Sequence, residues 1–210
     1  MTPTGLEVAL VMFVGMGPVK VLVYYLAAIH DATPAVGRRV ALRAVATAVI
    51  TALGLLLVGA LLMRLLHFSG PALVVAGGIV LLAYGLQMIL KVVPRDLPHS
   101  APSESDLMRL AVYPMGVPLV LNPAGIAAAT IFSAEAVDIG YLGLIAAIVV
   151  LMGALDVAVL FVARPIGSRL PREATLVLEQ LLGVLLAAVA VELIVIGLGQ
   201  FGIVDVPGRH

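Results

Sequence analysis

The sequence predicts an all-α, polytopic membrane protein with about six transmembrane helices. Of its 210 residues, 62% are hydrophobic and only 11% are charged, and the mean hydropathy is +1.20. Soluble domains carry about 25% charged residues. Six apolar stretches also reach the length of about 20 residues that is needed to cross the hydrocarbon core of a bilayer. We therefore expect the lipid bilayer to be the solvent of this chain.

The composition argues against several classes of functional site. Cysteine is absent, which removes disulfides, thiolate metal sites and thiol relays. The formal net charge is zero and gives no sign of a nucleic-acid partner. The four histidines fall at segment ends, in loops or in the tail, without the spacing of metal ligands. We expect no metal, no cofactor and no enzymatic activity.

Turn-forming sequence separates the predicted spans, because proline lacks the backbone N–H and crowds the preceding helical turn. The spans are Gly5–Ile29, Val40–Met63, Pro71–Val93, Met108–Ala134, Tyr141–Ala163 and Leu176–Val204. They form one membrane domain over residues 1–210, with a first half at about 5–93 and a second at about 108–204. The polar segment at about 94–107 is expected to be a cytoplasmic linker.

Basic residues near the span ends predict the orientation. Nine of the twelve lysines and arginines flank the first, third and fifth loops: Arg38, Arg39, Arg43, Lys91, Arg95, Arg109, Arg164, Arg169 and Arg172. Because cytoplasmic loops carry an excess of Lys and Arg, these loops are expected inside and both termini outside. The N-terminus has no basic region before its apolar stretch, so we expect an uncleaved first span.

The two halves resemble each other at an offset of 105 residues. Pro18 aligns with Pro123, and Gln87 aligns with Glu192. Three spans in each half would give the repeats opposite membrane orientations, a construction that recurs in secondary transporters. The sequence therefore predicts two inverted three-helix repeats.

A break is predicted in the middle of the first and fourth spans. Gly17 and Pro18 interrupt the first, and Asn122, Pro123 and Gly125 interrupt the fourth. Proline frees a carbonyl about four residues earlier, and in hydrocarbon a freed group must be satisfied by protein, water or ligand. A simple proline kink is the alternative. Two breaks at repeat-related positions favour a binding site for a solute with both an anionic and a cationic end.

The sequence resembles the MarC family of integral membrane proteins. The stretch "YPMGVPLVLNPAGIAAATIFSAEA" is similar to the fourth span of that family, and "LEQLLGVLLAAVAVELIVIGL" to its last span. The resemblance implies a multi-pass protein of the bacterial inner membrane, related to small neutral amino-acid transporters and to the amino-acid exporter superfamily. It also implies a site at Gly17, Pro18, Asn122, Pro123 and Gly125.

The first span departs from the family pattern. The family usually has an aspartate at the position of Gly17 and a glycine at that of Lys20. Lys20 is therefore a candidate partner for a substrate carboxylate. Asp156, Glu192 and Gln87 are the other polar residues well inside spans, and charges there are costly enough to require a function or a partner. We expect them to couple transport to protons or sodium, or to form ion pairs of Lys20 with Asp156 or Glu192.

The leading functional hypothesis is a secondary transporter of small amphoteric solutes, neutral amino acids such as glycine or alanine first, working by alternating access. A small-molecule substrate and the lipid bilayer are the expected partners. The sequence is also compatible with a homo-oligomer and does not decide the oligomeric state. The rival is a non-transporting membrane assembly or regulatory protein that retains the transporter fold. An integral membrane enzyme and a passive channel are weaker alternatives.

Overall fold

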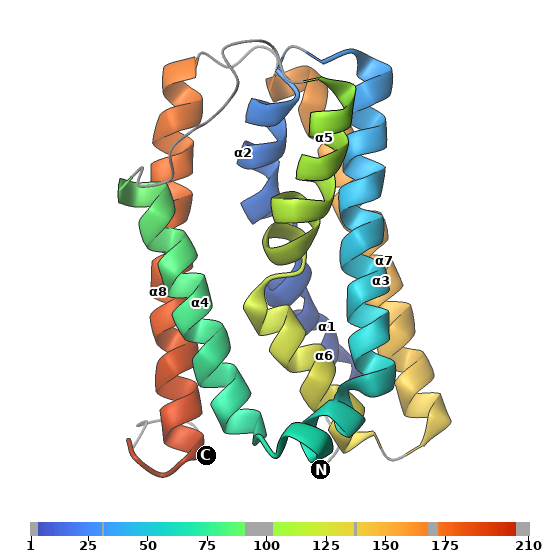
Figure 1. Ribbon diagram of the computed structural model, residues 1–210, viewed down its shortest axis with the longest axis vertical. Coiled ribbons are helices and arrows are strands. Elements are labelled where there is room, and N and C mark those ends of the chain that lie inside the picture. Colours follow the sequence, from blue (N-terminus) through green and yellow to red (C-terminus); the bar gives the residue numbers. More distant parts are fainter. Residues whose placement is uncertain (1–3, 31, 91–102, 137, 168–171, 205–210) are drawn as a thin grey trace.

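The computed structural model describes residues 4–30, 32–90, 103–136, 138–167 and 172–204, and these parts contain helices and no strand. In chain order the elements are α1 Gly5–Met16, α2 Val19–Ala28, α3 Pro34–Leu66, α4 Gly70–Leu90, α5 Glu104–Leu110, η1 Ala111–Val120, α6 Pro123–Glu135, α7 Ile139–Gly167 and α8 Arg172–Gln200. The helices run roughly along the long axis of the molecule (Figure 1). The all-α prediction is confirmed for the described residues.

Within the described residues, four helices are long and apolar enough to cross a membrane on their own. They lie within α3, α4, α7 and α8. A fifth crossing arises if the bent pair Glu104–Val120 and Pro123–Glu135 is one span. The expected first span consists of two short helices, α1 with 12 residues and α2 with 10, on either side of Gly17 and Pro18. The start of α1 and the end of α8 lie at the same end of the molecule (Figure 1).

The fourth span, expected from Met108 to Ala134 with a break at Asn122 and Pro123, has that break but is less regular before it. The helix begins earlier, at Glu104, and continues through η1, where Tyr113, Val117 and Pro118 have non-helical backbone angles. The two parts of the pair meet at an angle of 68°. The reason is local: Pro114 and Pro118 each remove a backbone donor inside η1, before Pro123 starts α6.

Side chains that cap the helices explain where several of them start. Thr4 and Glu7 form a capping box at the start of α1. Thr33 accepts a hydrogen bond from the N–H of Val36 ahead of Pro34, the first residue of α3. Each cap satisfies backbone donors that the helix itself leaves open. The polar residues between the apolar stretches thus fix the helix boundaries.

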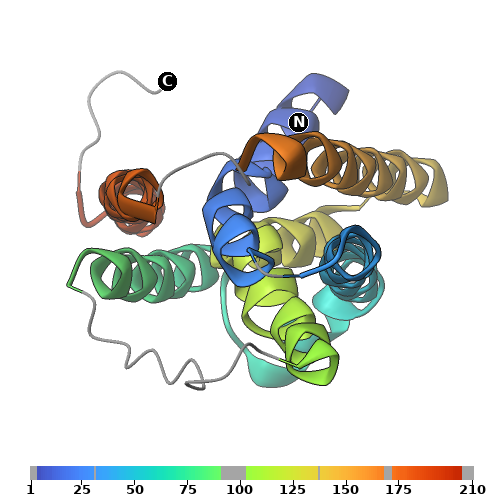
Figure 2. The same ribbon diagram turned by 90° about the horizontal axis from the view of Figure 1, so that it is seen from above.

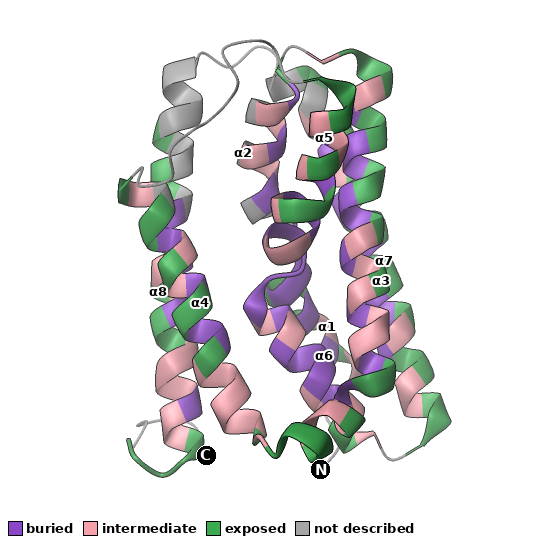
Figure 3. Ribbon diagram, in the orientation of Figure 1, coloured by how far each residue is buried: buried purple, intermediate pink, exposed green. Residues whose placement is uncertain are grey.

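The buried residues form two separate clusters. The larger one joins α1, α2, α3, η1, α6 and α7, and includes Met12, Tyr25 and Met115. The smaller one consists of Leu81 on α4 and Leu186 and Ala190 on α8. Buried positions run along the faces that α3 and α6 turn toward their neighbours (Figure 3). The molecule therefore has one main core and a second core between α4 and α8.

The α4–α8 pair stands side by side at one flank of the molecule, as seen from above in Figure 2. Small residues allow the two backbones to approach closely. A Cβ atom on Gly85 would lie 2.8 Å from the carbonyl oxygen of Gly183, and one on Gly78 would lie 2.9 Å from that of Ala190. Close backbone approach at small residues is the usual way in which membrane helices associate. The pair is thus a tightly packed unit of its own.

Candidate functional site

The break in the first predicted span lies at Gly17 and Pro18, as the sequence indicates. Gly17 ends α1 in an extended conformation, and Pro18 precedes α2. Both residues are buried. A Cβ atom on Gly17 would collide with the carbonyl oxygen of Phe13. The backbone found here therefore has no room for the aspartate that the MarC pattern places at this position.

The second break lies at Leu121 and Asn122, between η1 and α6. Asn122 is fully buried and caps α6, with its side-chain oxygen accepting from the N–H of Gly125 at 3.0 Å. Pro123 is the first residue of α6, where its missing N–H costs no helical hydrogen bond. The N-P-x-G sequence is thus a helix start placed in the middle of an apolar stretch.

The two breaks are joined through Asn122. Its side-chain amide donates to the carbonyl of Val14 at 2.8 Å, and its backbone N–H donates to the carbonyl of Gly15 at 2.9 Å. Both carbonyls belong to the last turn of α1, where the helix cannot satisfy them. One residue from the second half of the chain therefore completes the helix end in the first half.

Two glycines make this contact sterically feasible. A Cβ atom on Gly15 would lie 2.5 Å from Cα of Gly125, and a Cβ atom on Gly125 would lie 2.7 Å from the carbonyl oxygen of Gly15. No side chain larger than hydrogen fits at either position without moving a backbone. Gly125 is one of the site residues that the sequence predicts, whereas nothing in the sequence marks Val14, because a sequence does not show which carbonyls will be satisfied at a break.

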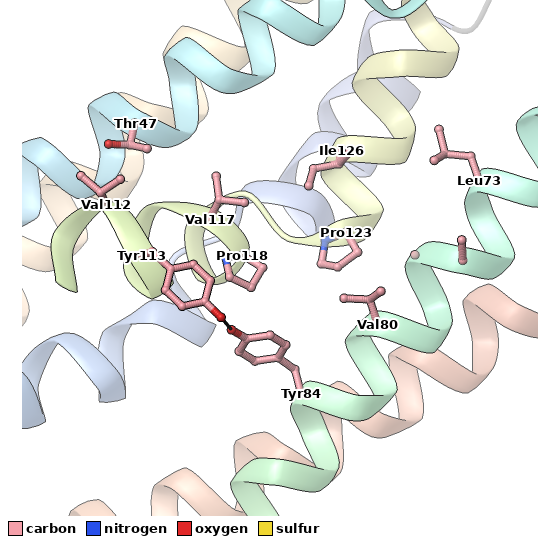
Figure 4. A pocket seen from close by; sticks show the side chains of 12 residues that line it. Thr47, Leu73, Val80, Tyr84, Val112, Tyr113, Val117, Pro118, Pro123 and Ile126 are labelled. Carbon is pink, nitrogen blue, oxygen red and sulfur yellow. Dashed lines mark hydrogen bonds between the residues drawn. The ribbon is translucent and has the colours of Figure 1, made fainter. Parts of the chain in front are cut away.

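A pocket of about 630 Å³ lies beside the second break (Figure 4). Its walls come from α4, η1 and α6, with one residue from α3: Leu73, Ala76, Gly77, Val80 and Tyr84; Val112, Tyr113, Val117 and Pro118; Pro123 and Ile126; and Thr47. Pro123 belongs to both the break and the pocket. The pocket lies between the α4–α8 pair and the main core.

Three hydroxyl groups are the polar side-chain groups of this lining. Tyr84 on α4 and Tyr113 on η1 point toward each other, and the Tyr84 hydroxyl donates to that of Tyr113 at 3.4 Å (Figure 4). The Thr47 hydroxyl donates to the carbonyl of Arg43, one turn earlier in α3. Tyr113 is 67% exposed and also contributes to the pocket wall.

The predicted coupling residues do not line the pocket. Asp156 is fully buried on α7. Gln87 on α4 and Glu192 on α8 are exposed, outside the lining of the pocket. The side chain of Lys20 lies outside the described part of the structure, so its predicted ion pairs stay predictions. The structure thus joins the glycine, proline and asparagine positions of the two breaks, and the predicted roles of the charged residues stay predictions.

Comparison with known proteins identifies a family of membrane proteins. The model of the family described as "MarC family integral membrane protein" matches residues 4–201. A UPF0056 membrane protein of Methanocaldococcus jannaschii is 31% identical over 156 residues, covering 71% of this chain and 76% of that protein. A UPF0056 membrane protein of Pyrococcus horikoshii is 25% identical over 195 residues, covering 91% and 93%. No solved structure matches the chain.

Proposed function

The chain belongs to the MarC family of integral membrane proteins, and from this membership and its two joined helix breaks we propose that it is a secondary transporter. Its substrates are small amphoteric solutes, in the first place neutral amino acids. The observation that carries the proposal is the contact of Asn122 with Val14 and Gly15. Interrupted helices deep in a membrane domain are a recurrent feature of transporter binding sites.

The order of the elements supports an internal repeat. Pro123 stands 105 residues after Pro18; Pro18 immediately precedes α2, and Pro123 is the first residue of α6. α7 begins at Ile139, 105 residues after α3 begins at Pro34. On this proposal, α1 to α4 and α5 to α8 are the two inverted repeats, with six crossings and both termini on the outer face of the plasma membrane.

Alternating access then takes place at the boundary between the two cores. One arrangement that would alternate access is rocking of one repeat against the other around the breaks at Pro18 and Pro123. The packing favours a different division, because α4 and α8 come from different repeats and share one core. We propose that this pair moves against the main core, and that the pocket between them opens first to one face of the membrane and then to the other.

Asn122 provides the direct test of the site. In proteoliposomes, Asn122→Leu should abolish saturable uptake of labelled neutral amino acids, since leucine keeps the volume but cannot bridge the two breaks. Thr130→Val is the matched control: Thr130 is also buried on α6, but its hydroxyl donates only to Ile126 of its own helix among the hydrogen bonds described. Full uptake by folded Asn122→Leu would contradict the proposal.

The same contact also supports a second function. Because protein groups satisfy the carbonyls of Val14 and Gly15, the breaks are stable without a solute. A membrane assembly or regulatory protein that retains the fold would show this geometry too. Such a protein would show no thermal stabilisation by any neutral amino acid and would co-purify with a defined partner. A transporter would show the stabilisation.

A further inference from the structure

We infer that the pocket between α4 and the η1–α6 break binds the apolar side chain of the substrate, so that solutes with a branched or aromatic side chain are preferred over glycine and alanine. The inference rests on the proposed function and names the substrate class of that site. It replaces the smallest neutral amino acids, which the sequence favours, by larger apolar ones.

The side chains that line the pocket indicate which part of a solute can occupy it. Apart from the three hydroxyls, the side chains of the lining are apolar, with Leu73, Val80 and Ile126 among the largest. No charged side chain lines this pocket among the described residues. A charge placed against such a wall would lose its hydration without compensation. The part of the solute that fills the pocket is therefore uncharged and apolar.

The size of the pocket favours solutes with a large side chain. A volume of about 630 Å³ is large compared with glycine or alanine. Each CH₂ group that moves from water to an apolar site increases affinity several-fold, so the four side-chain carbons of leucine can contribute roughly 100-fold over glycine. A solute without a side chain gains none of this contribution.

The hydroxyl groups of Tyr84 and Tyr113 can bind the polar end of the solute. The hydroxyls of Tyr84 and Tyr113 lie 3.4 Å apart, on opposite sides of the seam between the α4–α8 pair and the main core. A phenol hydroxyl can donate to a carboxylate and accept from an ammonium group. A lipid acyl chain would fill the apolar part of the pocket but would not use this pair. The occupant is therefore an amphiphilic solute.

A pair of neighbouring substitutions tests the inference. Val80 and Ile79 are exposed to a similar degree, 47% and 56%, but Val80 lines the pocket and Ile79 lies outside the lining. Val80→Phe should raise the KM for leucine uptake at least about tenfold and change glycine uptake by less than about threefold, because the added ring occupies side-chain space. Ile79→Phe, which adds the same ring on the outer face, should change neither.

The outcomes separate this inference from the proposed function. An unchanged leucine KM in Val80→Phe would overturn the inference, as would a wild-type KM for leucine no lower than that for glycine. Saturable glycine uptake would leave the proposed function standing in both cases. If Val80→Phe does not fold, the ranking of leucine above glycine in uptake and in thermal stabilisation of the wild-type protein decides the question.

The tyrosine pair has a test of its own. Tyr84→Phe keeps the ring and removes the hydroxyl, and should raise the KM for leucine and for glycine alike, by about two- to tenfold. An unchanged KM for both solutes would show that the two hydroxyl groups do not bind the solute.

Discussion

Asn122 connects two helix ends that are more than one hundred residues apart in the sequence. Its side chain donates to Val14 at 2.8 Å and accepts from Gly125 at 3.0 Å. In the absence of water, each of these backbone groups would otherwise cost several kcal/mol if left unsatisfied. A single amide therefore stabilises both breaks, and any solute that reaches these carbonyls must compete with it.

The glycines behind Asn122 predict a large effect on stability. Gly15→Ala places a Cβ atom 2.5 Å from Cα of Gly125, so it should destabilise the fold by about 2–3 kcal/mol through overpacking. Gly54→Ala is the control, because no atom lies within 4 Å of the added Cβ and alanine favours the helix by about 0.5–1 kcal/mol. Unfolding in detergent measures both. Equal stabilities of the two variants would refute the close contact.

Asp156 is the residue that we expect to couple transport to protons. It is fully buried on α7, and a buried carboxyl is a candidate proton carrier. Asp156→Asn keeps the shape and cannot titrate, so uptake by this variant should persist but no longer respond to a pH gradient. Proteoliposomes with and without an imposed gradient provide the measurement. A response equal to that of the wild type would assign the coupling elsewhere.

The sequence identified the breaking residues but not their partners. Gly17, Pro18, Asn122, Pro123 and Gly125 are recognisable because proline and glycine act on the backbone locally. Val14 contributes through its carbonyl, which every residue possesses, so no sequence pattern marks it. The pocket was missed for a related reason: Val80 and Ile126 are ordinary apolar residues in apolar spans.

The long helices were the most predictable elements. The spans expected at Val40–Met63 and Tyr141–Ala163 lie within α3 and α7. The fourth span was only partly predictable, because Pro114 and Pro118 were read as part of a helix. Their combined effect is a segment with non-helical angles at Tyr113, Val117 and Pro118. Prolines about one turn apart affect the same backbone hydrogen bonds. The backbone conformation that they produce together therefore differs from the sum of two separate kinks.

The contact between α4 and α6 allows a disulfide to be introduced across the seam between the α4–α8 pair and the main core. A Cβ atom on Gly77 would lie 3.5 Å from Cβ of Pro123, a separation at which a disulfide can form. Because the chain has no cysteine, Gly77→Cys with Pro123→Cys introduces one defined pair. Oxidation should reduce uptake at least about tenfold, and reduction should restore it.

The single variants, treated with the same oxidant, serve as controls for this cross-link. Uptake by the oxidised double variant equal to that of its reduced form would show that α4 and α6 do not separate during transport.

The division into two cores could not be foreseen from the sequence. In a soluble helix, the apolar stripe marks the face that packs. In a membrane helix both the packed face and the lipid-facing side are apolar, so Leu81 in the core and Leu86 on the surface have the same type of side chain. Composition therefore indicates that lipid is the solvent of the molecule, but not how many of its helices are long enough to cross the membrane or which helices pair.

The orientation that we propose for the chain in the membrane is a property of the whole molecule. The start of α1 and the end of α8 lie at the same end (Figure 1), which agrees with an even number of crossings. Which end faces outward is predicted by the nine basic residues of the first, third and fifth loops. The two joined breaks and the seam then lie within the bilayer, where a transported solute would pass.

Uptake of labelled neutral amino acids into sealed proteoliposomes tests the central claim, transport by this chain, most directly. The wild-type protein should give saturable uptake that exceeds the leak of protein-free vesicles, with leucine favoured over glycine. Uptake that rises linearly with concentration and equals the protein-free leak for every neutral amino acid would contradict the account.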